Sequence, residues 1–137
     1  MRLDVCRILE KQNIKPIVLA DEPNKGQTII EKLEKKLDRC THALVLLSPD
    51  DVGHKAGLDS ARKARARQNV VLELGYAIGK LGRENVIVLH RGAVDLPSDI
   101  YGLLYISYKK VEDHSTAILL LRELRSMGYE VDTNLVL

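Results

Sequence analysis

One carboxylate is a candidate for catalysis because of its place on a predicted helix. Apolar residues at helical spacing predict that helix over residues 68–81, and Glu73 falls at the border between its apolar and polar faces. A helical wheel puts Glu73 about 100° from the centre of the apolar stripe. The core can fix such a side chain in one rotamer while its carboxylate still faces a cleft. The alternative is a solvated surface glutamate near the helix N-terminus, where the helix dipole favours a negative charge.

Polar residues that could contact a ligand lie just before this helix. Asp50 and Asp51 follow Ser48 and Pro49 at the end of the apolar run 43–47, which is predicted to be the clearest buried strand in the chain. Parallel sheets bind ligands outside the carboxyl ends of their strands, so these carboxylates could contact ribose hydroxyls or a metal. They could equally serve only to turn the chain. A basic run follows, which could meet phosphates or stay solvated: Arg62, Lys63, Arg65 and Arg67.

The chain lacks the residue patterns of several other site classes. Cys6 and Cys40 form no Cys-x-x-Cys pair, so we expect reduced thiols and neither a disulfide scaffold nor a zinc site. The histidines are scattered, and no metal site is predicted. Three glycines in or just after the helix do not form a dinucleotide fingerprint. We expect these glycines to let another backbone or a ligand approach closely: Gly75, Gly79 and Gly82.

Length and charge narrow the function classes further. The 137 residues suffice for one domain, which we expect to span residues 1–137. Lys and Arg number 21 against 19 Asp and Glu, and this net charge of +2 does not favour binding to nucleic acid or to a membrane surface. No apolar run reaches the roughly 18 residues of a membrane span. The N-terminus has no signal-peptide pattern, so we expect a cytoplasmic location.

Helices and strands alternate along the chain, which predicts an α/β domain with a parallel sheet. Thr28 and Glu31 form a capping-box pattern before the second helix, and Gly128 is expected to end the last helix. The stretch 52–67 is expected to be a flexible, basic loop. We expect helices over 3–12, 29–37, 68–81 and 115–127, and strands over 17–20, 43–47, 85–90 and 103–106.

Five segments together carry a resemblance to a known family. The most specific is RARQNVVLELGY at 65–76, and the others are DEPNKGQTIIEK at 21–32, LLSPDD at 46–51, GKLGR at 79–83 and DLPSD at 95–99. With these segments the chain closely resembles the bacterial and archaeal TIR-like family from about residue 3 to residue 132. The resemblance implies a flavodoxin-like, three-layer TIR-like fold. Related domains are fused to STING or SAVED modules in antiphage systems that use cyclic nucleotides.

This resemblance also implies NAD⁺ glycohydrolase activity in antiphage defence. In the family the glutamate of the Gln-Asn-Val-x-x-Glu-Leu-Gly stretch is catalytic, and here it is Glu73. Asp50, Asp51 and Arg67 are expected to line the nucleotide pocket. Asn69 is expected to join them, at a position where eukaryotic TIR NAD⁺ hydrolases commonly carry Trp. NAD⁺ is then the substrate, and no further cofactor is implied.

The family normally opens with a hydrophobic central strand and a His-Gly-x-x loop, and this chain starts just beyond them. We therefore expect a domain that is N-terminally incomplete. Four buried strand side chains are worth roughly 6–12 kcal/mol, against a stability of about 5–15 kcal/mol for a whole domain. We expect four strands from this chain and a homo-oligomer that compensates for the missing strand. By similarity, the loop 21–28 governs self-association and closes over the nucleotide.

Two other functions stay open from the sequence. One is a non-catalytic TIR module that binds a nucleotide and works through self-association, which the missing strand favours. The other is an enzyme similar to nucleoside deoxyribosyltransferases, which also use a glutamate on a similar sheet.

Overall fold

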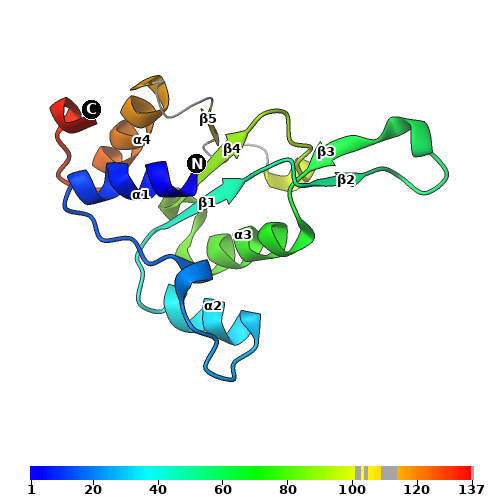
Figure 1. Ribbon diagram of the computed structural model, residues 1–137, viewed down its shortest axis with the longest axis horizontal. Helices are drawn as coiled ribbons and strands as arrows, with labels where there is room; N and C mark the ends of the chain where they lie inside the picture. The colour runs from blue at the N-terminus through cyan, green and yellow to red at the C-terminus, as the bar shows by residue number, and fades with distance from the viewer. Residues whose placement is uncertain (101–102, 104, 109–113, 137) are drawn as a thin grey trace.

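The computed structural model describes residues 1–100, 103, 105–108 and 114–136. All four predicted helices are confirmed, with ends shifted by at most one residue. The α-helices are α1 (Arg2–Lys11), α2 (Ile29–Leu37), α3 (Gln68–Leu81) and α4 (His114–Ser126) (Figure 1). The strands are β1 (Ala43–Leu47), β2 (Asp51–Gly53), β3 (Lys63–Arg65), β4 (Val86–Arg91) and β5 (Tyr105–Tyr108). No helix in the described ranges is both long enough and apolar enough to cross a membrane.

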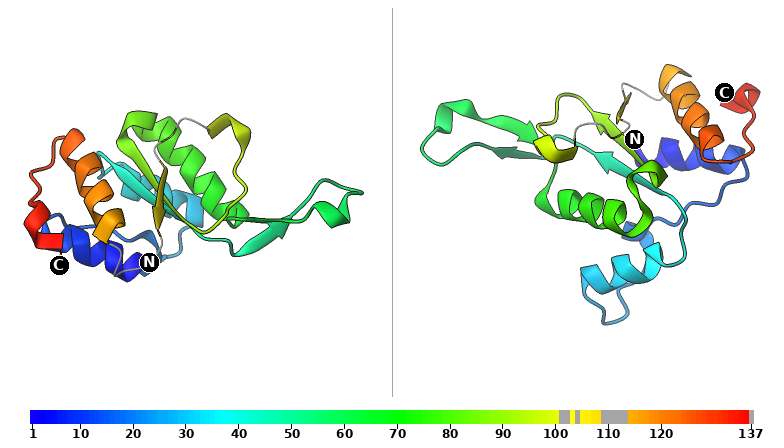
Figure 2. Two further views of the ribbon diagram at one scale, coloured as in Figure 1. Left: turned by 90° about the horizontal axis from the view of Figure 1, so that it is seen from above. Right: turned by 180° about the vertical axis from the view of Figure 1, so that it is seen from behind.

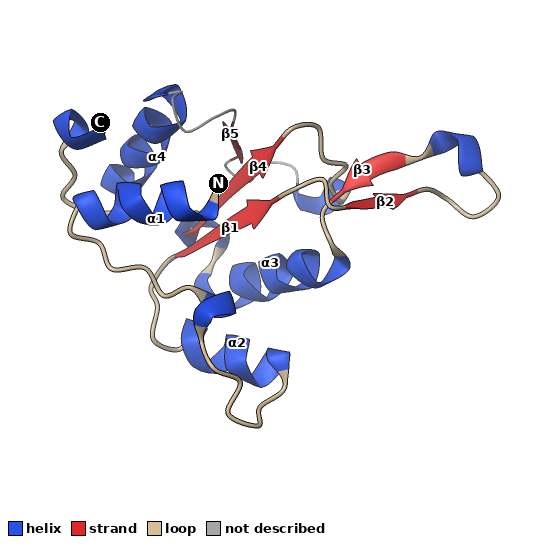
Figure 3. Ribbon diagram, viewed as in Figure 1, coloured by secondary structure: helices blue, strands red, loops and turns tan. Residues whose placement is uncertain are grey.

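A parallel sheet with the strand order β1-β4-β5 forms the middle layer of the fold (Figure 3). The β1–β4 register starts at Ala43 opposite Val86, and the β4–β5 register starts at Val88 opposite Tyr105. Residues 86–89 of the central strand are at most 2% exposed. Such burial is expected for an all-apolar strand that is covered on both faces. The sequence-based α/β fold with a parallel sheet is therefore confirmed.

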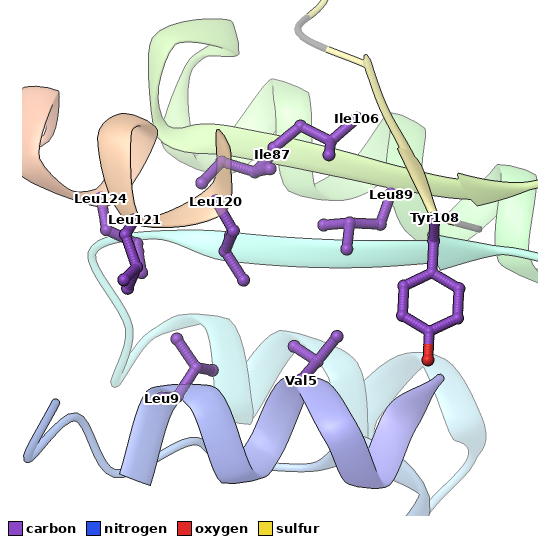
Figure 4. Close-up of a cluster of buried hydrophobic side chains, with 9 residues drawn as sticks. All are labelled: Val5, Leu9, Ile87, Leu89, Ile106, Tyr108, Leu120, Leu121 and Leu124. Atoms are coloured by element: carbon purple, nitrogen blue, oxygen red, sulfur yellow. The ribbon is translucent and has the colours of Figure 1, made fainter. Parts of the chain in front are cut away.

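Each face of the sheet carries its own apolar cluster. Helices α1 and α4 cover one face, and their apolar side chains point toward the strands in Figure 4. Helices α2 and α3 cover the other face. Successive side chains of a strand point to opposite faces, so Ile87 and Leu89 join the first cluster while Val86 and Val88 join the second. The result is the three-layer arrangement that the sequence predicts.

The helix ends follow the signals in the sequence. Thr28 Oγ1 accepts a hydrogen bond from the Glu31 N–H at 3.3 Å, and the Glu31 carboxylate accepts one from the Thr28 N–H at 2.8 Å, so the capping box is confirmed. After α4, Gly128 has a φ of +93°. The N–H of Tyr129 donates to the Leu124 carbonyl at 3.0 Å, which completes a Schellman motif.

The strand predicted over 17–20 is wrong. Leu19–Asp21 forms a 3-10 turn instead. Pro16 has no N–H to donate to a sheet, and Ile17 is 37% exposed at the surface. The segment crosses from α1 on one face to α2 on the other, as Figure 1 shows. The expected sheet of four strands therefore has three among the described residues, and the strand predicted at 103–106 lies at Tyr105–Tyr108.

The stretch 52–67, which we expected to be a flexible loop, contains an antiparallel hairpin of β2 and β3. Asp51 lies opposite Arg65 in its register, and Gly53 lies opposite Lys63. The hairpin projects away from the body in every view (Figure 2), and residues 54–64 are exposed. Strands of three residues carry too little periodicity for the sequence to reveal them.

Gly75 and Gly79 face open space on α3. Apart from the adjacent residues and the local backbone of the helix, no described heavy atom lies within 4 Å of the position where a Cβ would stand at either glycine. The expected close approach of another backbone is therefore not made by the described part of this chain. At Gly82, the Glu84 carboxylate lies close to that position.

We expect Gly75→Ala to raise the free energy of unfolding by about 0.5–1 kcal/mol, because alanine loses less backbone entropy in a helix than glycine does. Urea unfolding followed by circular dichroism measures the change. Gly128→Ala is the opposite control and should destabilise the fold, because its φ of +93° disfavours a side chain. A lower stability of Gly75→Ala would show that the open space on α3 is needed.

Tyr108 links β5 to α1 across the first cluster. Its hydroxyl donates to the Asp4 carboxylate at 2.8 Å, and in Figure 4 it points toward α1. Burial and, next, the hydrogen bond to Asp4 raise the pKa of Tyr108 from 10.0 to about 12. The neutral hydroxyl is therefore the form that the folded state stabilises.

We expect Tyr108→Phe to lower the free energy of unfolding by about 1 kcal/mol at pH 7, because Asp4 loses a donor. Since folding raises the pKa of Tyr108, the tyrosine's contribution is complete below pH 10.0 and is lost as the pH rises toward about 12. The difference between the two proteins should shrink over that interval in urea titrations. A difference independent of pH would show that Tyr108 contributes only by packing.

Candidate functional site

The sheet brings the predicted site residues to one end of the fold. The root of the hairpin and the N-terminal end of α3 lie beside the carboxyl ends of β1 and β4 (Figure 1). Asp50 lies between β1 and β2 and Asp51 begins β2, while Arg67 is the N-cap residue of α3 and Asn69 and Glu73 lie in its first two turns. This is the edge at which parallel sheets bind ligands.

Glu73 is half-buried in the second turn of α3, between buried Leu74 and exposed Leu72. No hydrogen bond or ion pair joins its carboxylate to another residue in the described part of the chain. Burial raises the pKa of Glu73 above its usual value, and the positive charge of Arg67 partly opposes that shift. The carboxylate is therefore held partly out of water and is available to a ligand.

Asp50 and Arg67 form a loose ion pair near Glu73. The Arg67 Nη2 and the Asp50 Oδ2 are 3.7 Å apart, and the two side chains are 69% and 48% exposed. A pair this exposed and this long contributes little to stability. Either side chain can therefore exchange its partner for a ligand at small cost.

Asn69 lies in the first turn of α3, one helical turn before Glu73, and its side chain is exposed. Residues four apart on a helix are neighbours on its surface. The structure thus places Asn69 on the same side of α3 as Glu73.

Asp51 differs from the other predicted residues because both of its carboxylate oxygens are engaged. Oδ1 accepts a hydrogen bond from the Val52 N–H at 2.8 Å, and Oδ2 lies 3.4 Å from the Arg65 Nη2. From the sequence, Arg65 is a candidate only as one member of the basic run, and Gly53 is not a candidate. The basic run pointed toward Arg65, but its pairing with Asp51 follows from a hairpin that the sequence does not reveal.

The loop 21–28 is fastened to both neighbouring helices. The Arg2 Nη1 lies 2.9 Å from the Asp21 Oδ1, and the Lys36 Nζ lies 2.6 Å from the Glu22 Oε2. The pair to α2 is the less exposed of the two, while the pair to α1 is exposed and contributes little to stability.

No group of three or more His, Cys, Asp or Glu within the described ranges is arranged to hold a metal ion. A shallow cavity of about 260 Å³ lies between α1 and the C-terminal segment, and none of the predicted site residues lines it. Gln12 lines this cavity, and its side-chain amide donates one hydrogen bond to the backbone of Asp132 and accepts another from it.

Comparisons with known proteins match the region that holds these residues. A family model described as the TIR domain of CAP12/Pycsar effector proteins covers residues 1–110. The Escherichia coli K12 protein named "uncharacterized protein YuaY" is 45% identical over 101 residues, which are 74% of this chain and 33% of that protein. Protein tirC of Dictyostelium discoideum is 43% identical over 117 residues, which are 79% of this chain and 58% of that protein.

A third relative is the Pycsar effector protein PaPycTIR of Pseudomonas aeruginosa. It is 41% identical over 92 residues, which are 64% of this chain and 29% of that protein. Our chain thus spans between 29% and 58% of the length of these three relatives. All the predicted site residues lie inside the 1–110 match.

We expect Glu73→Gln to be at least as stable as the wild type at pH 7, because it removes a half-buried charge that forms no hydrogen bond or ion pair with the residues the structure describes. Folding raises the pKa of Glu73 above 4.5, so the wild type loses stability as the pH rises from 4.5 through the pKa in the folded state. The advantage of Glu73→Gln should therefore be larger at pH 7 than at pH 4 in thermal unfolding. Exposed Glu84 is the control, and Glu84→Gln should change stability at neither pH. A clear loss of stability in Glu73→Gln at pH 7 would indicate a structural role for the carboxylate.

Proposed function

Because the chain belongs to the CAP12/Pycsar effector TIR-domain family, we propose that it hydrolyses NAD⁺ at the bond between nicotinamide and ribose, in antiphage defence. The observation that carries the proposal is Glu73, a half-buried carboxylate without a partner among the described residues. It lies where the family's catalytic glutamate is expected.

The chemistry of this bond suits a single fixed carboxylate. When nicotinamide leaves, the ribose develops oxocarbenium character, as sugars do in glycoside hydrolysis. A carboxylate held near the ribose stabilises that positive charge and orients the hydroxyl groups. Nicotinamide departs as a neutral base, so its departure needs no general acid. Glu73 supplies the negative charge from a position that α3 and the core keep rigid.

The neighbouring residues support binding of the rest of the nucleotide. Arg67 is exposed and only loosely paired with Asp50, so it can bind the diphosphate with a charge-assisted contact. Asp50 can accept hydrogen bonds from ribose hydroxyls, and exposed Asn69 can donate and accept next to Glu73. NAD⁺ is the substrate, and the proposed reaction needs no other cofactor. We also propose that the chain forms a homo-oligomer, and light scattering during the assay measures its oligomeric state.

We expect the protein to release nicotinamide from NAD⁺ and Glu73→Gln to be slower by about 100-fold or more, the size typical of losing one charge-stabilising group. Chromatography of nicotinamide, ADP-ribose and cyclic ADP-ribose after incubation measures the rate and the product. Glu84→Gln is the matched control and should keep wild-type activity.

The assay also separates the alternative functions. Activity that survives in Glu73→Gln would contradict the proposed mechanism. Tight binding of ADP-ribose in calorimetry without turnover of NAD⁺ would indicate a non-catalytic nucleotide-binding module. Transfer of deoxyribose between free bases would indicate a deoxyribosyltransferase.

A further inference from the structure

The Arg65 guanidinium packs over Gly53, in space that any side chain at position 53 would fill. Its guanidinium lies over Gly53 on the same face of the hairpin, so that a Cβ on Gly53 would stand 2.6 Å from the Arg65 Cζ and 2.8 Å from the Nε. The Nε is buried and has no hydrogen-bond partner among the described residues. The Arg65 side chain as a whole is 38% exposed, so the packing against Gly53 covers one side of the guanidinium and leaves the rest in contact with solvent.

The same guanidinium connects the two strands at the root of the hairpin. Its Nη2 lies 3.4 Å from the Asp51 Oδ2, directly across the register. On the β3 side, the Asp95 N–H donates to the Ala64 carbonyl at 2.7 Å, which fastens β3 to the loop after β4. The end of β1, the hairpin and the loop after β4 are therefore joined around Arg65.

Two adjacent carboxylates consequently have different surroundings. Asp51 has both oxygens engaged, by the Val52 N–H and by Arg65. Asp50 has only the loose contact of 3.7 Å with Arg67. Asp51, which Arg65 contacts, is the next residue in the chain after Asp50.

We propose that Arg65 is a positioning residue of the nucleotide site, which holds the hairpin root so that Asp50 and Arg67 face the ribose and the phosphates of the substrate. In this proposal the guanidinium packs over Gly53, and Asp51 is the ion-pair partner of Arg65 and does not contact the ligand. This inference rests on the proposed hydrolysis of NAD⁺. It assigns nucleotide affinity to the hairpin root and the chemical step to Glu73.

Gly53→Ala tests the inference with one added methyl group. The atoms that the methyl group would meet belong to the end of the flexible Arg65 side chain, so we expect the side chain to move away from position 53 while the backbone keeps its conformation. We expect KM for NAD⁺ to rise about fivefold with kcat within about twofold, the pattern of a lost binding contact. Gly79→Ala is the matched control, since it adds the same methyl group in open space and should leave both constants unchanged.

Two further variants separate positioning from simple damage to the fold. Arg65→Lys keeps the charge but loses the planar fork, so its KM should rise as in Gly53→Ala. In an Arg65→Ala background, Gly53→Ala should have no further effect, because the methyl group then displaces nothing. Wild-type KM in Gly53→Ala, additive effects in the double variant, or a loss confined to kcat would each overturn the inference.

Different variants test the role of Arg65 and the proposed hydrolysis of NAD⁺. Activity that persists in Glu73→Gln contradicts the hydrolytic mechanism whatever Gly53→Ala does. If the wild type binds ADP-ribose without hydrolysing NAD⁺, the same variants are compared by calorimetry, and about a fivefold weaker Kd in Gly53→Ala alone still supports the role of Arg65. A wild type that neither binds nor hydrolyses the nucleotide overturns both.

Discussion

The parallel pairing of β1 with β4 determines where chemistry can occur in this chain. Parallel neighbours need a long crossover connection, and here the hairpin and α3 together form it. The crossover returns α3 across one face of the sheet, so its first turns lie beside the ends of both strands (Figure 1). Residues from the end of β1 and from the start of α3 meet for this reason, and not because any of them attract one another strongly.

The charges at this end of the sheet divide into a fixed and an exchangeable set. In the pair of Asp51 and Arg65 the side chains are 42% and 38% exposed, but they lie opposite each other in the strand register and the guanidinium packs over Gly53. The pair of Asp50 and Arg67 is long and exposed. A binding site needs both kinds, because a rigid frame preserves the geometry while weakly held groups can exchange their partners for a ligand at small cost.

Glu73 differs from both sets because its carboxylate is half-buried and has no hydrogen bond or ion pair among the described residues. Desolvation of the carboxylate disfavours its charged form, and the charge of Arg67 partly opposes this effect. Packing of α3 through Leu74 and Ala77 keeps the helix in place despite this cost. Such perturbed groups cluster at functional sites, because a local cost to stability is tolerated where a charge is needed.

The sequence by itself determined the helices, the capping box at Thr28, the strands β1 and β4, and the place of Glu73 at the border of the apolar face of its helix. These features depend on local patterns, namely side-chain periodicity and caps that act within a few residues of themselves. Tertiary structure decided that 17–20 is not a strand and that 52–67 forms a hairpin, because a strand exists only where a neighbouring backbone satisfies its hydrogen bonds. It also decided that Asp51 faces Arg65 while Asp50 faces Arg67, since the partner of a long charged side chain depends on distances that the order of residues does not contain.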